Sequence, residues 1–181
     1  MAKMTYTNKP KYTVETGPVD AVCYSVQDLG IQDTGKYGKK PQLAIGFEID
    51  QRIEDPESDF NGKRMVKWVT YNWFWNEKSN LVKAFMSWFS VVPTAQELKE
   101  GIDIDEWCLE KPCTLNLVQK GDYVNIENIM KANKNNKMEP EISSDPPAWI
   151  RTKMIDSGTW VEPGQEPTIE QAPPMEDDLP F

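Results

Sequence analysis

Histidine is absent from the 181-residue sequence, which removes the commonest general base and every histidine-dependent catalytic triad. Cysteine is scarce: Cys23, Cys108 and Cys113 are an odd number without Cys-x-x-Cys spacing, which predicts neither a disulfide framework nor a zinc site. A glycine-rich phosphate loop is also missing. We therefore expect a protein that is not an enzyme and that holds no metal ion and no cofactor.

Long apolar runs are missing as well. No stretch of about 18 apolar residues occurs, so no membrane span is predicted, and the first residues, MAKMTY, lack the apolar stretch of a signal peptide. We therefore expect a cytoplasmic protein. Paired carboxylates such as Asp103 and Asp105 lie in a generally acidic run, which is typical of a solvated surface, and we assign them no chemistry.

Acidic residues outnumber basic ones, 29 to 20, for a net charge of −9. The excess is concentrated at the end of the chain, because residues 161–181 contain six acids and no base. Residues 1–160 hold the 20 basic residues against 23 acidic ones, a net charge of −3. Phosphate binding depends on local patches more than on net charge, so this composition is compatible with a nucleic-acid partner. The bases form three groups: Lys36, Lys39 and Lys40; Lys63, Arg64 and Lys67; and Lys131, Lys134 and Lys137.

Residues 63–75 interleave basic and aromatic side chains without a Gly or a Pro, which predicts one long strand. Alternate residues of a strand point to opposite faces, and here both faces carry aromatics. One face can fill a core, while the other offers flat apolar side chains beside a cation, which unpaired bases need for stacking. A strand buried on both faces would show the same pattern. The odd-numbered face holds Met65, Val69, Tyr71, Trp73 and Trp75, and the even-numbered face holds Arg64, Val66, Trp68, Asn72 and Phe74.

Further strands are predicted over residues 18–29 and 42–50, and a hairpin is predicted over residues 112–130 around Lys120 and Gly121. The alternation in 42–50 is typical of a half-buried strand. Its outer face has only small residues at Ala44 and Gly46, which would let another backbone or a flat ligand approach closely. Helices are predicted after a Ser79 or Asn80 cap up to Pro93, over 95–108 behind a capping box, and over 147–157.

The order of three strands, a helix and two strands is that of the OB-fold, a five-stranded Greek-key barrel. We therefore predict an all-β domain with inserted helices over residues 18–131, preceded by an extended arm over 1–17. A linker over 132–160 follows, which is polar up to Ser144, is expected outside the ordered core and contains the short helix. Residues 161–181, rich in Pro and acids, are predicted to be a disordered tail.

The last seven residues, MEDDLPF, resemble the acidic tip of bacterial and phage single-stranded DNA-binding proteins. The segments DLGIQ (28–32), NEKSNL (76–81), KPCTLNL (111–117) and PAWI (147–150) resemble small phage replication proteins of the OB-fold single-strand-binding type. The resemblance implies a protein that coats single-stranded DNA during phage replication or recombination in the host cytoplasm, with a tip that recruits replication proteins. The acidic body and the extra acidic segment at 95–110 depart from the bacterial relatives, so tetramer formation is not carried over, and a homo-oligomer stays open.

DNA contacts are predicted from the central strand and from the basic loops: Lys36, Tyr37, Lys39, Lys40, Arg64, Lys67, Trp68, Phe74 and Lys131. A bulge would exchange the faces and bring Lys67, Tyr71 and Trp73 into the groove instead. The partner-binding tip is predicted to be Asp177, Asp178, Leu179, Pro180 and Phe181. One alternative is an OB-fold adaptor whose Trp-rich face binds another protein, and a second is a nuclease with clustered carboxylates.

Overall fold

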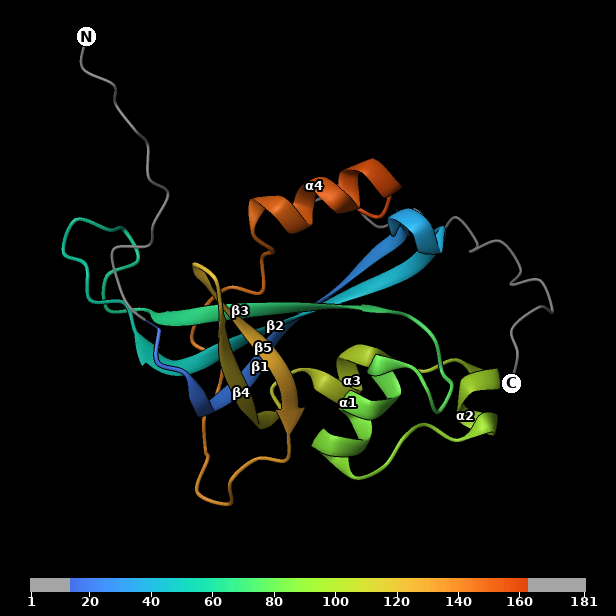
Figure 1. The fold of residues 1–181 in the computed structure, drawn as a ribbon, viewed down its shortest axis with the longest axis horizontal. Helices are drawn as coiled ribbons and strands as arrows, with labels where there is room; N and C mark the ends of the chain where they lie inside the picture. The colour runs from blue at the N-terminus through green and yellow to red at the C-terminus, as the bar shows by residue number, and fades with distance from the viewer. Residues whose placement is uncertain (1–13, 163–181) are drawn as a thin grey trace, which may run out of the picture.

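The computed structural model describes residues 14–162, which form a mostly β structure around a five-stranded antiparallel sheet (Figure 1). In chain order the elements are β1 (Gly17–Asp33), the short 3-10 helix η1 (Gly35–Tyr37), β2 (Lys39–Arg52), β3 (Arg64–Asn72), α1 (Asn80–Phe89), α2 (Ala95–Glu100), α3 (Ile104–Cys108), β4 (Pro112–Lys120), β5 (Tyr123–Met130) and α4 (Ala148–Ser157). Predictions for residues 1–13 of the arm and 163–181 of the tail lie outside the described residues, and Gly17 already belongs to β1.

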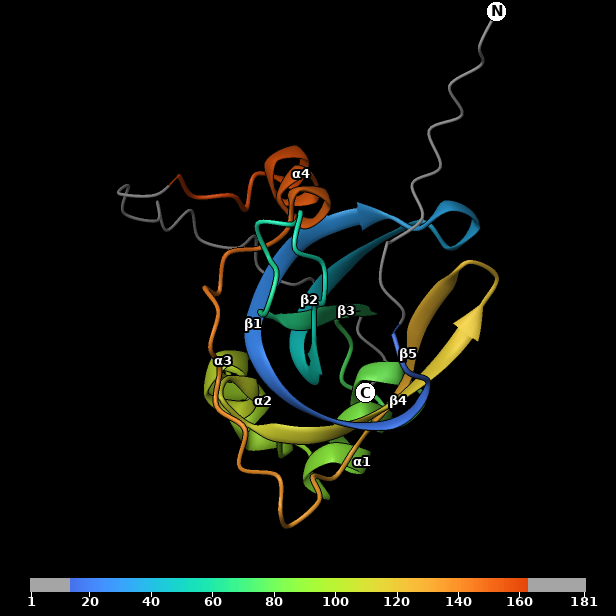
Figure 2. The same cartoon turned by 90° about the vertical axis from the view of Figure 1, so that its left-hand side faces the viewer.

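The strand order in the sheet is β3-β2-β1-β4-β5, and β1 is the strand that links its two halves. The first residues of β1 pair with β4, and the rest pair with β2 across two register shifts, at Cys23/Ser25 and Asp28/Gly30. Such bulges bend a strand, and β1 follows a wide arc (Figure 2). The edge strands approach each other where Lys67 Nζ of β3 donates a 2.8 Å hydrogen bond to the carbonyl oxygen of Val124 in β5.

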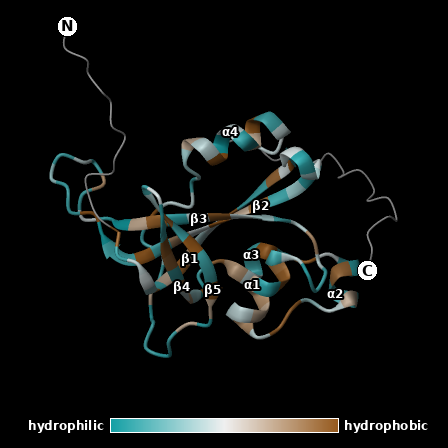
Figure 3. Cartoon of the chain, viewed as in Figure 1, coloured by the Kyte–Doolittle hydropathy of each residue, from teal (hydrophilic) through white to brown (hydrophobic). Residues whose placement is uncertain are grey.

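The main core lies between the concave face of the sheet and the helices α1 and α3. Figure 3 shows hydrophobic residues along the central strands and on these helices. The apolar residues of the odd-numbered face, Met65, Val69, Tyr71, Trp73 and Trp75, pack against this core. Helix α1 begins as predicted, because the Ser79 side chain accepts a hydrogen bond from the Val82 amide, and Trp88 donates from Nε1 to the Pro112 carbonyl at 2.9 Å.

The outer face of β1 and β2 is covered by α4 and by the chain that precedes it. Leu29 and Ala44 pack against Ile150 and Met154 of α4, with Trp68 and Trp160 at the border. Residues 131–147 contain no helix or strand, yet the expectation that they lie outside the ordered core is wrong for Asn136. Its buried amide donates to the carbonyl oxygens of Ala21 and Cys113, both at 3.0 Å. These hydrogen bonds fasten the segment to the paired interior strands β1 and β4.

A buried carboxylate holds the same segment further along. Glu48, in the middle of β2, is fully buried and accepts hydrogen bonds from the backbone amides of Glu141 and Ile142 at 3.0 and 3.3 Å. Arg64 lies 3.4 Å from Glu48 and 3.1 Å from Glu141, and it also donates to the Glu139 carbonyl at 2.7 Å. Because every residue from Leu43 to Ile49 is buried, the prediction of a half-buried strand over 42–50 is wrong.

Three other features differ from the sequence prediction. The central strand ends at Asn72, where the Phe74 amide bonds back to the Asn72 carbonyl at 3.1 Å in a tight turn. The helix expected over 95–108 is divided by Gly101, whose φ of 88° is left-handed, although its predicted capping box at Thr94 is present. The space above Gly46 is filled by the Trp68 ring of the protein itself, which would lie 2.6 Å from a Cβ at this position.

Candidate nucleic-acid interface

The tip of the β1–β2 hairpin presents an aromatic ring among lysines. Tyr37 is 68% exposed, and Lys36 Nζ lies 5.1 Å from the centroid of its ring. The turn is fixed from within: the Thr34 amide donates to the Gly38 carbonyl at 2.9 Å, and the Gly35 amide donates to Asp33 Oδ1 at 2.9 Å. These hydrogen bonds order the backbone from which the exposed side chains project.

A second lysine and ring meet beside the tip of this hairpin, where Lys40 pairs with Gln32. Lys40, the second residue of β2, places its Nζ 5.4 Å from the centroid of the Phe74 ring, which follows the end of β3. The two segments are tied by a 2.7 Å hydrogen bond from the Trp73 amide to the Pro41 carbonyl. The structure thus brings Lys36, Tyr37, Lys39, Lys40 and Phe74 into one region, which we call the basic aromatic patch.

Next to Phe74 lies a cavity of about 380 Å³. It opens between the end of β3 and the loop that leads into α1, and none of its lining side chains is acidic. Its polar groups are largely amides: Asn72 Oδ1 accepts a hydrogen bond from Gln42 Nε2, and Asn76 Oδ1 accepts one from the Lys78 amide, both at 2.9 Å. The lining consists of Thr70, Tyr71, Asn72, Phe74, Asn76, Lys78, Ser79 and Asn80.

The tip of the β4–β5 hairpin, a turn that the sequence predicted, also carries a lysine, a glycine and an exposed tyrosine, but Tyr123 was not among the predicted DNA contacts. Tyr123 is 70% exposed and stands opposite Lys120 in the strand register. Figure 2 shows both hairpins reaching out on the same side of the molecule, and in Figure 1 they lie toward opposite ends of β3. The signal available in the sequence was a lysine and a tyrosine beside a glycine, as at Lys36, Tyr37 and Gly38.

Four other predicted DNA contacts lie outside the basic aromatic patch. The Arg64 side chain is 11% exposed and is bound by carboxylates and a carbonyl, as described above. Trp68 donates from Nε1 to the Tyr24 hydroxyl at 3.0 Å and packs beside α4, and burial raises the pKa of Tyr24 to about 12. Burial lowers the pKa of Lys67, which bonds to β5. Lys131 is exposed just after β5. Of the residues that a bulge would have exposed, Tyr71 and Trp73 pack against the core.

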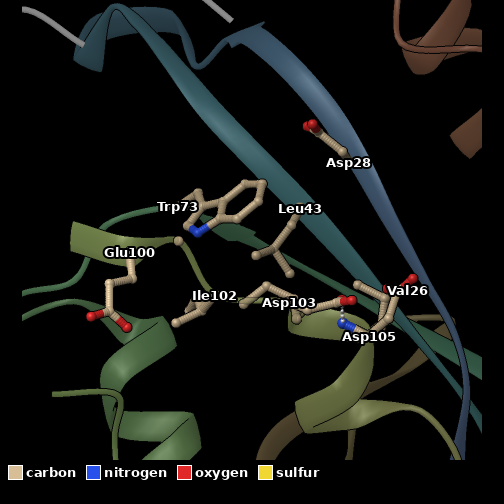
Figure 4. Close-up of a pocket in the computed structure, with 10 residues that line it drawn as sticks. Val26, Asp28, Leu43, Trp73, Glu100, Ile102, Asp103 and Asp105 are labelled. Carbon is tan, nitrogen blue, oxygen red and sulfur yellow. Dashed lines mark hydrogen bonds between the residues drawn. The ribbon is translucent and has the colours of Figure 1, made fainter. Parts of the chain in front are cut away.

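A larger cavity, of about 530 Å³, is lined by Trp73 (Figure 4). Its lining contains apolar side chains and no basic residue. Four carboxylates also line it: Asp28, Glu100, Asp103 and Asp105. Partial burial and the neighbouring Asp103 raise the pKa of Asp105. Negative charge on this wall repels phosphate, so the larger cavity does not suit a nucleic-acid strand.

No protein-family model, curated protein or solved structure matches the chain. Within residues 14–162, no helix is long and apolar enough to cross a membrane. In the same part of the chain, no three His, Cys, Asp or Glu side chains are grouped so that they could hold a metal ion.

Proposed function

We propose that this chain is an OB-fold protein that binds and protects single-stranded DNA, independently of sequence, during phage replication or recombination. The strand order β3-β2-β1-β4-β5, the helices between β3 and β4, and the hydrogen bond from Lys67 to β5 support the OB-fold. Such folds bind oligonucleotides across strands 2 and 3 and through the loops L12 and L45. In this chain those loops are the β1–β2 and β4–β5 hairpin tips.

The observation that carries the proposal is that a lysine ammonium lies over the rings of Tyr37 and Phe74, and that the exposed Tyr123 stands opposite Lys120 in the strand register at the second hairpin tip. A binder that ignores sequence needs flat side chains for the bases and cations for the phosphates. Each stacked base contributes about 1–3 kcal/mol, and each neutralised phosphate makes the affinity depend on salt. Rings at Tyr37, Phe74 and Tyr123 would then supply most of the affinity, and the neighbouring lysines would guide the backbone.

The acidic tip is proposed to recruit replication or recombination proteins. Residues 175–181 lie outside the described residues, and the support for their role is the resemblance of MEDDLPF to the tips of single-stranded DNA-binding proteins. Leu179, Pro180 and Phe181 provide an apolar anchor beside Asp177 and Asp178, which suits an apolar pocket bordered by Arg or Lys on a partner.

The test is a fluorescence-anisotropy titration of labelled oligo-dT with the full-length protein. Tyr37→Ala, Phe74→Ala and Tyr123→Ala should each weaken binding by about 5- to 160-fold, which corresponds to one lost stacking contact of about 1–3 kcal/mol. The matched control is Phe60→Ala. Phe60 is 60% exposed with Lys63 Nζ 5.4 Å from its ring centroid, but it lies in an acidic loop. Equal losses in all four variants, or no loss in any, would contradict the proposed interface.

An adaptor that binds another protein is the second candidate, and the larger cavity favours it. This cavity of about 530 Å³, lined by Trp73 and four carboxylates, suits a cationic side chain of a protein partner better than a phosphate. If the wild-type protein fails to bind oligo-dT at low salt, the adaptor becomes the better account of the chain.

A further inference from the structure

We infer that the protein stacks on the bases of a bound single strand at two separated points, the basic aromatic patch and the tip of the β4–β5 hairpin, and leaves the bases between these points without a stacking partner. The inference rests on the proposed function, because it needs a single strand at this interface. It goes further in stating which nucleotides of the bound segment are stacked: a short group at each end and none in the middle.

The two points lie toward opposite ends of β3 (Figure 1). At one end Lys67 Nζ donates to the Val124 carbonyl, which places Tyr123, the preceding residue of β5, beside this part of β3. At the other end β3 stops at Asn72, and Phe74 follows two residues later. Five residues separate Lys67 from Asn72, so at a rise of about 3.3 Å per residue the two points are about 17 Å apart.

Of the described residues of β3 between these points, none presents an exposed ring. The exposed side chains there are those of Thr70 and Asn72, and neither is aromatic. The Trp68 ring packs over Gly46 and beside α4, and Tyr71 packs against the main core. A strand that runs along β3 therefore has rings for its bases at the two ends of its path and not along the middle.

The spacing sets the number of nucleotides between the stacked groups. A stacked strand advances about 3.4 Å per nucleotide, so about 17 Å corresponds to about five nucleotides, and a stretched strand needs fewer. Residues 63–76, which include β3, contain no acid that would repel the phosphates on this path. We therefore expect about three to five unstacked nucleotides, with stacked bases on Tyr37 and Phe74 at one side and on Tyr123 at the other.

The experiment measures the affinity of the full-length protein for three strands of equal length, about twelve nucleotides, which lies within the range of about 4–16 that OB-folds cover. The first strand is oligo-dT. The second has thymidines in its two outer thirds and abasic nucleotides in its central third, and the third strand has the reverse arrangement. The second should bind nearly as tightly as oligo-dT, because the bases it lacks have no ring to stack on. The third supplies bases to one point only, so it should bind about 5- to 160-fold more weakly than the second, which corresponds to one lost stacking contact.

Tyr123→Ala tests the assignment of the second point. This variant should lose about 5- to 160-fold in affinity for the first two strands. It should bind the third strand as the wild type does, because the central thymidines of that strand occupy the basic aromatic patch, which has two rings. The matched control is Phe60→Ala, which removes an exposed ring beside Lys63 in the loop between β2 and β3 and should leave all three affinities unchanged.

Two results would overturn the two-point arrangement while the proposed function stands. One is a third strand that binds as tightly as the second, because the stacked bases would then be contiguous. The other is a Tyr123→Ala variant that weakens all three strands equally or none of them, because the second tip would then contact no separate group of bases. If the wild type binds none of the strands, the proposed function itself fails, and this inference fails with it.

Discussion

Replacing Glu48 tests how the chain after β5 is held on the sheet. Glu48 is 0% exposed, it accepts the amides of Glu141 and Ile142, and it lies 3.4 Å from the Arg64 guanidinium. Glu48→Gln keeps the shape of the side chain but removes the charge and turns one acceptor into a donor that faces these amides. We expect a large loss of stability from a substitution that changes no side-chain volume.

The expected loss in the free energy of unfolding depends on the contacts that Arg64 keeps when Glu48 loses its charge. Breaking a buried ion pair costs about 3–5 kcal/mol when the remaining charge has no compensation. Arg64 keeps Glu141 at 3.1 Å and the Glu139 carbonyl at 2.7 Å, so the loss should lie at the lower end, about 3 kcal/mol. With a urea m-value of about 2 kcal/mol/M, the midpoint of unfolding should fall by about 1.5 M. The amides of Glu141 and Ile142 should also exchange with solvent faster than in the wild type.

The control is Glu141→Gln, at a side chain that is 42% exposed and pairs with Arg52 at 2.9 Å and with Arg64 at 3.1 Å. Its unfolding midpoint should fall much less than that of Glu48→Gln, because Arg64 keeps Glu48 and the Glu139 carbonyl, and solvent screens the pair with Arg52. If Glu48→Gln unfolds at the same midpoint as Glu141→Gln, the buried carboxylate does not hold the segment, and the explanation given for the covered outer face is wrong.

Three further results are expected. Trp68→Ala should destabilise the fold by about 3 kcal/mol in urea unfolding, because its ring packs on Gly46; weaker DNA binding at unchanged stability would instead make Trp68 a base contact. Burial raises the pKa of Cys23, Cys108 and Cys113, that of Cys108 to about 12, whereas thiols of the unfolded chain ionise near about 8.5. The unfolded chain therefore loses protons first, so the free energy of unfolding should fall as pH rises from about 9 to 12, with a shallower fall in Cys108→Ala. Deleting residues 175–181 should leave the unfolding midpoint unchanged and DNA affinity equal or higher, but it should abolish capture of replication partners in a pull-down; capture by both forms would remove the role assigned to the tip.

Local signals predicted several elements well. Helix α1 follows from the Ser79 cap and the apolar spacing after it, and the β4–β5 hairpin follows from alternation on either side of Gly121. The meeting of Lys40 with Phe74 could also be anticipated, because a basic loop and an aromatic strand end were both assigned to the interface. The helix and the hairpin depend on residues close in sequence or on one pattern repeated along a strand.

The remaining features depend on contacts between distant segments, which no local pattern reveals. Glu48 and Arg64 read as surface charges in the sequence, and only the docking of residues 139–142 makes them buried partners. Trp68 has the composition of a stacking platform, but α4 and Gly46 enclose it. Tyr123 was overlooked because one tyrosine beside a turn is unremarkable until the fold sets it opposite Lys120 at the tip of a hairpin.

The most direct measurement is the affinity of the full-length protein for oligo-dT and for a duplex of equal length at several salt concentrations. Five lysines, Lys36, Lys39, Lys40, Lys78 and Lys120, lie at the proposed interface, and each phosphate contact on a single strand contributes about 0.7 to the slope of log affinity against log salt. We predict binding to the single strand with a negative slope no steeper than about 3.5, and weaker binding to the duplex, whose bases cannot reach Tyr37, Phe74 or Tyr123. A flat salt response, or equal affinity for the duplex, would contradict the single-strand-binding account.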